Sequence, residues 1–295
     1  MRIFHTYWLV LRQFALQNTM ETVENSARRG EYKALYIEEY LYHYVDNKWT
    51  QSFLPYTVPI SLAYVIIIFS LQNYMKSRPP FQLRWPLVIW NILLAAFSIC
   101  GTLRLLPGLW ISLREYGFTF SVCNLSFALK YHPLAFWLSL FTWSKVIEFG
   151  DTLFIILRKR KLTFLHWYHH CLTLIITWYV NSTEASTVYW FATTNMFVHS
   201  FMYTYYAVTA MKVKVPVFIA MTITTMQIAQ MFMGCFVNLL AAYVYYSGKY
   251  CEQTIMSLFL LIFLYASLGW LFCRFFRDSY YKRTNRSNLL YEKYQ

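Results

Sequence analysis

The sequence predicts an all-α membrane protein with seven transmembrane helices. Of its 295 residues, 58% are apolar and only 13% are charged, and the charged residues fall mainly between long apolar runs. A hydrocarbon core about 30 Å thick needs roughly 20 apolar residues per helix. Seven runs of about this length are present: Leu54–Tyr74, Pro86–Leu106, Leu134–Leu157, Leu162–Val180, Val188–Met211, Val215–Leu240 and Ile255–Phe276.

The runs follow one another as a single domain. The third and fifth are the weakest by hydropathy because they carry polar residues, and the sequence contains no repeat, Gly/Ser linker or low-complexity tract. We predict a membrane domain over residues 53–276, an N-terminal arm over 1–52 and a basic tail over 277–295. Residues 1–20 lack the apolar core and cleavage site of a signal peptide, so the first run is expected to act as the signal.

The positive charges predict the orientation in the membrane. With seven spans the two termini lie on opposite sides, and the side richer in Lys and Arg is cytosolic. Fifteen of the 26 basic residues lie in the segments that follow the first, third and fifth runs or at and after the end of the seventh. We therefore expect a cytosolic C-terminus and a lumenal or extracellular N-terminus. The net charge of +13 is then mostly topological and does not indicate nucleic-acid binding.

The six cysteines fall into two groups. Four lie within or at the ends of apolar runs, where we expect packing residues. Cys123 and Cys251 lie in loops predicted to face the oxidising side, where a disulfide between them would persist; two free thiols are the alternative. The same side carries glycosylation sequons at Asn124 and Asn181, of which Asn181 is too close to the membrane for easy modification.

Ionisable residues inside the third and fourth runs mark a candidate functional site, because such groups are costly in a membrane unless they face protein or water. One face of the third run carries, at helical spacing, Lys145, Glu148, Asp151 and Thr152. A structural ion pair explains the first two as well as a catalytic pair does. The fourth run opens with His166, His169 and His170, which share one helical face. Three imidazoles on one face favour function over packing.

Polar stripes continue in the next two runs. The fifth carries Asn195, His199, Tyr203 and Tyr206, and the sixth carries Thr224, Gln227 and Gln230. For Asn, Gln and Tyr, hydrogen bonds between helices are as good an explanation as substrate contact. At 1.5 Å per residue, the polar groups of the third and fourth runs lie at a similar depth from the cytosolic side. We predict a polar chamber in the cytosolic half that continues toward the opposite side as an apolar tunnel.

Clustered histidines support either metal binding or nucleophilic and acid–base catalysis. A di-iron oxidase of the desaturase kind needs more histidines than the seven of this chain, three of which lie outside the chamber. A single zinc site made by His166, His170 and His199, as in a metal-dependent lipid oxidase or hydroxylase, stays an alternative. A non-enzymatic seven-span receptor is another, although the three-histidine face near the cytosolic side argues against it. A neutral imidazole can also attack a thioester and form an acyl-imidazole.

Four segments stand in order along the chain: KVIEFGDT (145–152), HWYHH (166–170), NMFVHSFMYTYY (195–206) and TTMQIAQ (224–230). They resemble the signature boxes of the ELO family of very-long-chain fatty acid elongases in both order and spacing. The resemblance extends over about residues 49–276. The Trp-Tyr pair inside the histidine box, with Ile-Leu-Arg-Lys (156–159) before it, resembles the branch that acts on saturated and monounsaturated acyl chains.

The resemblance implies a 3-oxoacyl-CoA synthase of the endoplasmic reticulum, which condenses acyl-CoA with malonyl-CoA, releases CO2 and CoA, and needs no metal or other cofactor. It also implies that six of the seven spans form an inverted barrel around a substrate tunnel. Carried over by motif, His169 is the acyl-accepting nucleophile of a ping-pong reaction and His199 lies close to the reacting carbon. The other members of the catalytic set, which handle protons, assist decarboxylation or orient imidazoles, are His166, His170, Glu148 and Asp151.

The other polar residues of the four boxes are expected to contact the substrates. They are Lys145, Thr152, Asn195, Tyr203, Tyr206, Thr224, Gln227 and Gln230. Arg158 and Lys159 are candidates for binding the CoA phosphates at the cytosolic mouth, although topology alone explains most of the charges there. The resemblance also supports the disulfide between Cys123 and Cys251, because the flanking loops match in position.

The resemblance implies partners and a location as well. Membrane lipid and the other elongation enzymes, namely a 3-oxoacyl-CoA reductase, a dehydratase and an enoyl reductase, are the expected partners, and a homodimer stays open. Many relatives end in a dilysine-type retrieval signal, whereas this sequence ends Tyr-Glu-Lys-Tyr-Gln (291–295). Residence in the reticulum is therefore an expectation from the resemblance alone.

Overall fold

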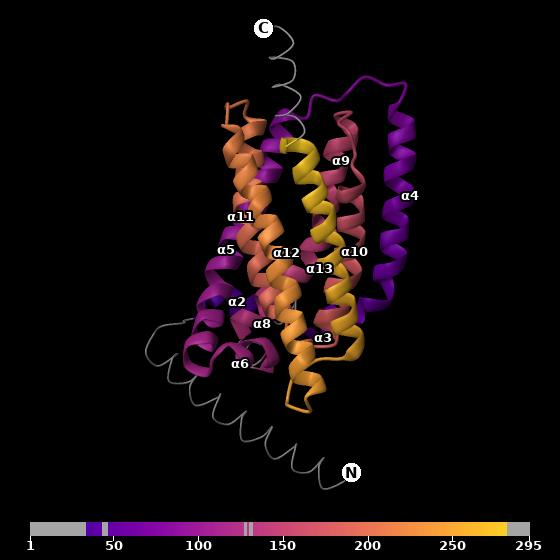
Figure 1. Ribbon diagram of the computed structural model, residues 1–295. Coiled ribbons are helices and arrows are strands. Elements are labelled where there is room, and N and C mark those ends of the chain that lie inside the picture. Colours follow the sequence, from indigo (N-terminus) through magenta and orange to yellow (C-terminus); the bar gives the residue numbers. More distant parts are fainter. Residues whose placement is uncertain (1–33, 43–46, 127–128, 130–131, 282–295) are drawn as a thin grey trace.

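The computed structural model describes residues 34–42, 47–126, 129 and 132–281, and every regular element within these residues is a helix (Figure 1). Most of the predicted N-terminal arm lies outside the described residues. The same is true of most of the predicted basic tail, including the terminal segment 291–295 that was compared with a retrieval signal.

All seven apolar runs are helical. The long helices are α4 (Thr57–Met75), α5 (Arg84–Tyr116), α8 (His132–Ile147), α9 (Phe149–Leu157), α10 (Phe164–Ser182), α11 (Val188–Ala210), α12 (Val217–Tyr246) and α13 (Ile255–Phe276). The short ones are α2 (Tyr36–Tyr42), α3 (Asn47–Ser52), η1 (Leu54–Tyr56), α6 (Phe118–Cys123) and η2 (Arg277–Tyr281). Among the described residues, four helical stretches are long and apolar enough to cross a membrane: Leu54–Met75, Arg84–Tyr116, Val217–Tyr246 and Ile255–Tyr281.

The third predicted span is not one continuous helix. Helix α8 ends at Ile147, Glu148 forms a turn, and α9 begins at Phe149. At this point the backbone hydrogen bonding tightens, because the Asp151 N–H bonds the Glu148 carbonyl three residues back at 3.1 Å, as in a 3₁₀ turn. The Glu148 carboxylate also accepts hydrogen bonds from Ser144 and Lys145 on the preceding turn. The break in the helix thus lies at a buried, hydrogen-bonded carboxylate, where the sequence pattern predicts an uninterrupted helix.

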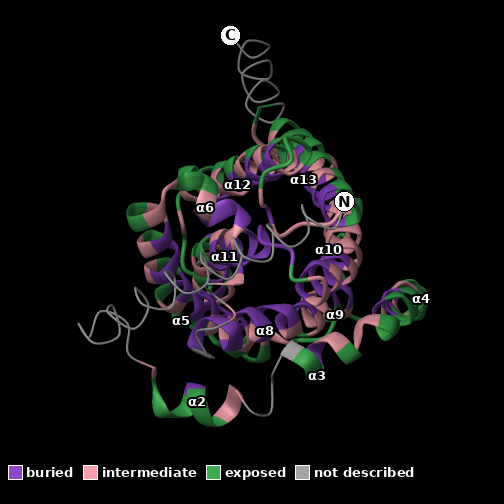
Figure 2. Cartoon of the chain, turned by 90° about the horizontal axis from the view of Figure 1, so that it is seen from below, coloured by how far each residue is buried: buried purple, intermediate pink, exposed green. Residues whose placement is uncertain are grey.

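The helices pack side by side in a circuit that differs from their order in the sequence. Contacts link α8 to α10, α10 to α13, α13 to α12, α12 to α11, α11 to α5, and α5 back to α8. Seen along the bundle, these helices surround a common centre, while α4 stands outside and contacts α9 and α10 (Figure 2). The largest buried apolar cluster joins α5, α8, α10, α11, α12 and α13.

A disulfide and a set of backbone hydrogen bonds hold together one end of the bundle, on which α6 lies. Cys123 at the end of α6 is bonded to Cys251 just before α13, the pair that the sequence led us to expect. The adjacent Glu252 N–H bonds the Cys123 carbonyl at 2.9 Å, and the Ser186 N–H bonds the Glu252 carbonyl at 2.7 Å. The connection into α13 is therefore tied both to α6 and to the loop before α11.

The short helix α2 is fixed to the bundle by one buried carboxylate. Glu38 is 1% exposed and accepts hydrogen bonds from Arg104 Nε and Nη2, both at 2.6 Å, and from Trp137 Nε1 at 2.7 Å. Burial raises the pKa of the Glu38 carboxyl, but the hydrogen bonds from Arg104, the Leu35 N–H and Trp137 outweigh it, so the pKa is lowered from its usual value. This contact joins α2 to both α5 and α8.

Candidate active site

A cavity of about 640 Å³ lies inside the bundle and reaches the end at which α9, α11 and η2 finish. Its size falls in the range of small-molecule sites, roughly 300–1,000 Å³. All but three of the predicted site residues line it: Glu148, Asp151, Arg158, His166, His169, His170, Asn195, His199, Tyr203, Tyr206, Thr224, Gln227 and Gln230. Residues from four separate segments of the sequence therefore meet around one space.

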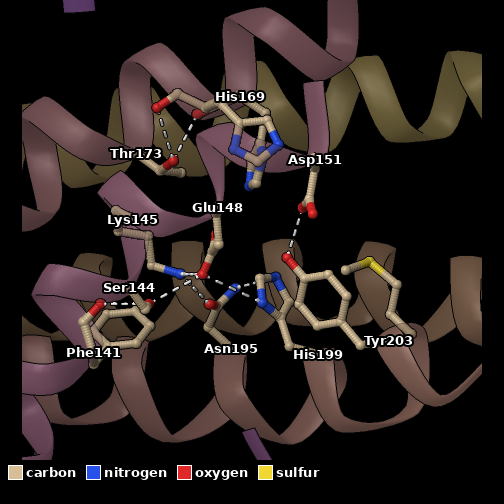
Figure 3. A network of polar contacts seen from close by, with 12 residues as sticks. Phe141, Ser144, Lys145, Glu148, Asp151, His169, Thr173, Asn195, His199 and Tyr203 are labelled. Atoms are coloured by element: carbon tan, nitrogen blue, oxygen red, sulfur yellow. Dashed lines mark hydrogen bonds and ion pairs between the residues drawn. The ribbon is translucent and has the colours of Figure 1, made fainter. Parts of the chain in front are cut away.

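A buried polar network on one side of the cavity fixes His199 (Figure 3). Lys145 Nζ donates to Glu148 Oε1 at 2.6 Å and to Asn195 Oδ1 at 3.0 Å. Because the Asn195 oxygen faces Lys145, its Nδ2 group faces His199 Nε2, at 3.2 Å. His199 Nε2 is then the acceptor, and the ring proton is on Nδ1, which lies 3.8 Å from Glu148 Oε1. Lys145, Glu148 and Asn195 thus select one tautomer of His199.

Asp151 is held by two donors from other helices. Trp90 Nε1 of α5 donates to Asp151 Oδ1 at 2.6 Å, and the Tyr203 hydroxyl of α11 donates to Asp151 Oδ2 at 2.9 Å. The hydrogen bond from Trp90 requires glycine at position 150, because a Cβ there would lie only 2.5 Å from Trp90 Cζ2. Both carboxylate oxygens are therefore committed to protein donors, and the position of Asp151 against the cavity is defined.

The three histidines of α10 have different surroundings although they share one helical face. His166 Nε2 lies 2.9 Å from Thr152 Oγ1, which in turn lies 2.7 Å from the Tyr64 hydroxyl of α4. His170 is 5% exposed, and its Nδ1 has no hydrogen-bond partner among the described residues. Its ring lies edge-on to Phe149. The hydroxyl of Thr152 therefore positions the His166 ring, although Thr152 does not itself line the cavity.

His169 lines the cavity and is partly exposed, whereas His170 and His199 are buried. Its ring packs against that of His170, with centroids 5.2 Å apart, and no hydrogen bond joins either ring nitrogen to another described residue. The backbone of His169 is held by Thr173, whose hydroxyl donates to its carbonyl at 2.7 Å. Figure 3 shows His169 opposite Glu148 and His199 across the site. Its imidazole therefore lines the cavity without a hydrogen-bond partner for either ring nitrogen among the described residues.

Some of the remaining predicted residues line a cavity, and others bond to neighbouring parts of the fold. Gln230 is 4% exposed, and its Nε2 group is a buried donor without a partner among the described residues. Lys145 lines a second, smaller cavity rather than the large one. Lys159 turns away from both, because its Nζ donates to the carbonyls of Lys76 and Arg78 at 3.1 and 3.0 Å. Of the two predicted CoA contacts, Arg158 lines the cavity and Lys159 fixes the end of α4 instead.

The predicted zinc alternative requires three ligands at one point. Within the part of the chain that the structure describes, no group of three His, Cys, Asp or Glu side chains comes together as a metal ion needs. His199 uses Nε2 to contact Asn195, and His166 uses Nε2 to contact Thr152. The donor arrangement therefore suits hydrogen bonding more than metal coordination.

Several residues that shape the site were not predicted from the sequence. Trp90 and Tyr64 each support a polar residue of the third predicted span, and Tyr280 of η2 lines the cavity with its hydroxyl 3.3 Å from Thr224 Oγ1. A signal was available for the first two, because a Trp or Tyr inside an apolar run needs a partner for its polar atom. Tyr280 lies in the predicted tail, where no such argument applies.

The fold and site define a class of protein: a helical, multi-pass membrane protein with a histidine-rich cavity inside the bundle. Residues 49–288 match the GNS1/SUR4 family, ELO, and the chain belongs to this family.

Individual relatives agree over most of their length. Very long chain fatty acid elongase 6 of Drosophila melanogaster is 45% identical over 219 residues, which cover 74% of this chain and 69% of the relative. Very long chain fatty acid elongase 3 of Homo sapiens is 40% identical over 237 residues, covering 80% and 85%. Very long chain fatty acid elongase 6 of Gallus gallus is 38% identical over 258 residues, covering 87% and 94%.

Proposed function

We propose that this protein is the condensing enzyme of fatty acid elongation, a 3-oxoacyl-CoA synthase that works through an acyl-histidine at His169. The relatives are named as fatty acid elongases, which supports the overall reaction. The observation that carries the mechanism is the contrast among the cavity histidines. His166 and His199 each have a ring nitrogen bonded to a neighbouring side chain, and His170 is only 5% exposed. His169 is partly exposed and lines the cavity with no such bond among the described residues.

The first half-reaction transfers the acyl group. A ring nitrogen of neutral His169 attacks the thioester carbonyl of acyl-CoA, the new C–N bond forms and the C–S bond breaks. The proton that the imidazole loses goes to the departing CoA thiolate, so free CoA leaves as a thiol. We propose that His170 and His166 assist this proton transfer, because the ring of His170 packs against that of His169 and lies 4.4 Å, between centroids, from that of His166.

The second half-reaction forms the new carbon–carbon bond. Malonyl-CoA loses CO2 as its C–C bond breaks, which leaves the enolate of acetyl-CoA. The enolate carbon attacks the acyl-imidazole carbonyl, and the C–N bond breaks with its electron pair returning to His169, which takes up a proton. The buried Gln230 amide is an available donor for the developing oxyanion. Glu148 and Asn195 keep His199 in a single tautomer beside the reacting carbon.

Substrate binding follows from the shape and charge of the cavity. Arg158 and Arg160 line it, and because both belong to the turn after α9 we propose that they hold the CoA phosphates there. No metal enters the proposed mechanism. The acyl chain is proposed to be saturated or monounsaturated, in line with the Trp-Tyr pair of the histidine box.

The proposed function carries a topology and a location with it. The contact circuit of α5, α8, α10, α11, α12 and α13 supports an inverted barrel, which with α4 makes seven spans when α8 and α9 cross as one. We propose that the chain lies in the endoplasmic reticulum membrane with its N-terminus in the lumen and its C-terminus in the cytosol. Cys123, Cys251 and the sequon at Asn124 then face the lumen. A reductase, a dehydratase and an enoyl reductase would process the product.

The test is the mass of the purified protein after incubation with palmitoyl-CoA alone. We expect an added palmitoyl group on the wild type that is discharged by malonyl-CoA, and none on His169→Ala. Tyr168→Phe is the matched control. Tyr168 precedes His169 in the sequence, but its hydroxyl donates to Ser267 and the residue does not line the cavity. This variant should carry the adduct like the wild type.

Four outcomes separate the alternatives. An adduct on His169→Ala would refute His169 as the acyl acceptor. Condensation with malonyl-CoA without any adduct on the wild type would remove the covalent step while retaining the enzyme. No condensation of any acyl-CoA would remove the proposed activity itself. Loss of activity after chelation, restored by added metal, would favour a metal-dependent reaction instead.

A further inference from the structure

His169 lines the large cavity and also a second cavity of about 10 Å³. His169, Asn195, Gln230 and Met231 line both, so the two spaces adjoin. The small one has room for about one water molecule. The predicted apolar tunnel beyond the chamber is therefore nearly closed in this structure, among the residues that it describes.

A bound acyl-CoA needs space on both sides of His169. The CoA group and the acyl tail are attached to the same carbonyl carbon and leave it in different directions. With CoA toward the arginines at the open end, the tail is directed to the far side of His169. The walls of the small cavity include the apolar side chains of Phe191, Tyr265 and Leu268 beside polar ones. The space between these side chains therefore determines the length of the acyl tail that can bind.

Tyr265 occupies the space between three helices at this point. It is 2% exposed, and its ring lies directly on the backbone of Gly234 in α12, because a Cβ there would be 2.1 Å from Tyr265 Cε1 and 2.2 Å from Cζ. On its other side the ring meets Phe191 of α11 edge-on, with centroids 5.9 Å apart and planes at 81°. The absence of a side chain at Gly234 therefore leaves the space that the Tyr265 ring occupies.

The ring has little freedom to move sideways out of the bundle. Helices α12 and α13 approach closely one turn further along, where a Cβ at Gly269 would be 3.4 Å from Met231 Cβ. Leu261 and Leu264 on the same side of α13 are 0% and 1% exposed. A side chain added at position 234 would consequently push the ring toward Phe191 and the small cavity, not toward the membrane.

We infer that Tyr265 and Gly234 form the stop that sets the acyl-chain length this enzyme accepts. This inference rests on the proposed function and names its specificity-determining residues. The Tyr265 ring limits how far the tail extends past His169, and Gly234 keeps the ring partly withdrawn from that path. Removing the Tyr265 ring lengthens the acyl chain that the enzyme accepts, and adding a side chain at position 234 shortens it.

The experiment measures kcat/KM of the full-length protein with malonyl-CoA and a series of saturated acyl-CoAs, from lauroyl- through palmitoyl- and stearoyl- to icosanoyl-CoA. Because a methylene that fits or clashes in an apolar pocket changes kcat/KM by about tenfold or more, Tyr265→Ala should raise the icosanoyl-to-palmitoyl ratio at least about tenfold. Gly234→Ala should lower the stearoyl-to-lauroyl ratio by a similar factor.

A double variant shows whether the two positions act on each other. With the Tyr265 ring gone, the added methyl at position 234 has nothing to displace, so Gly234→Ala should not change the length profile of Tyr265→Ala. Tyr265→Phe keeps the ring and should keep the wild-type profile. Gly269→Ala is the matched glycine control, because its new methyl makes only an ordinary contact with Met231. Tyr265→Leu replaces Tyr265→Ala if the latter is not recovered as a folded protein by size-exclusion chromatography.

The results distinguish this inference from the function on which it rests. Unchanged chain-length ratios in Tyr265→Ala or Tyr265→Leu and in Gly234→Ala, with palmitoyl-CoA still elongated, would overturn the stop and leave the elongase in place. An altered ratio in Gly269→Ala equal to that in Gly234→Ala would also overturn it, since general loosening of α12 against α13 would then be the cause. A wild-type protein that condenses no acyl-CoA would overturn the proposed function first.

Discussion

Gly150→Ala should impair the site from a position that touches no substrate. A Cβ at Gly150 would lie 2.5 Å from Trp90 Cζ2 and 2.7 Å from Cη2, whereas ordinary contacts begin at 3.4 Å. The indole must then move back by about 0.9 Å. Its Nε1 now donates to Asp151 at 2.6 Å, and a retreat of this size along the bond brings the two atoms to the limit of hydrogen bonding.

The expected loss follows from that one bond. A hydrogen bond to a carboxylate contributes about 1.5–3 kcal/mol, which corresponds to about a 10- to 150-fold fall in kcat/KM if Asp151 acts in the reaction. Helix propensity works in the opposite direction, because Ala is favoured over Gly inside a helix by about 1 kcal/mol. The variant should therefore keep most of its thermal stability while its activity falls.

The assay is condensation of palmitoyl-CoA with malonyl-CoA, measured beside the unfolding temperature of each variant. Trp90→Phe removes both the indole N–H and the two carbons that the new methyl would strike, so it should reproduce the loss of activity. On that background Gly150→Ala should add little. A Gly150→Ala protein of normal activity, or an equal further loss on the Trp90→Phe background, would refute the link from Gly150 through Trp90 to Asp151.

Two further predictions concern buried charges. Lys145→Met leaves Glu148 buried without its cation, so it should lower the free energy of unfolding by about 3–5 kcal/mol, and adding Glu148→Gln should recover part of the loss; a lower unfolding temperature for the double variant would contradict this pairing. The pKa of Glu38 is lowered in the folded protein, so its stabilisation is present at neutral pH and is lost as the pH falls below the ordinary glutamate value of about 4.3. Thermal unfolding against pH should show wild type and Glu38→Gln converging in acid, and a gap that widens in acid would show the opposite sign.

The sequence predicted the helices well because their signal is local. A run of about 20 apolar residues is helical wherever it lies in a membrane, since each backbone group must bond within its own segment. Its ends are less certain: α5 continues to Tyr116, ten residues past the predicted end, because Leu109 and Ser112 still face the buried core. Periodicity does not predict the break at Glu148, because the apolar pattern continues through it while the backbone bonding changes at Asp151.

The sequence predicts which side chains of the candidate site share a helical face, but not which residues of other helices they contact. Helical spacing placed Asn195 and His199 on one side of α11, and the structure joins them by a hydrogen bond. Spacing says nothing of which helix lies opposite, so Trp90 went unnoticed although it supports Asp151. For the same reason the sequence predicts a substrate contact at Lys159, whereas in the structure this residue has a φ of 52° and its amine bonds the backbone at the end of α4.

The break in the third span also accounts for the differences among three histidines that the sequence makes equivalent. Because α9 restarts at Phe149, Thr152 comes to lie beside His166, and Phe149 lies against His170. All three histidines line the cavity, but His166 and His170 also contact residues of α9. The irregularity therefore lies where α9 meets two of the three histidines, and these contacts distinguish their surroundings from those of His169.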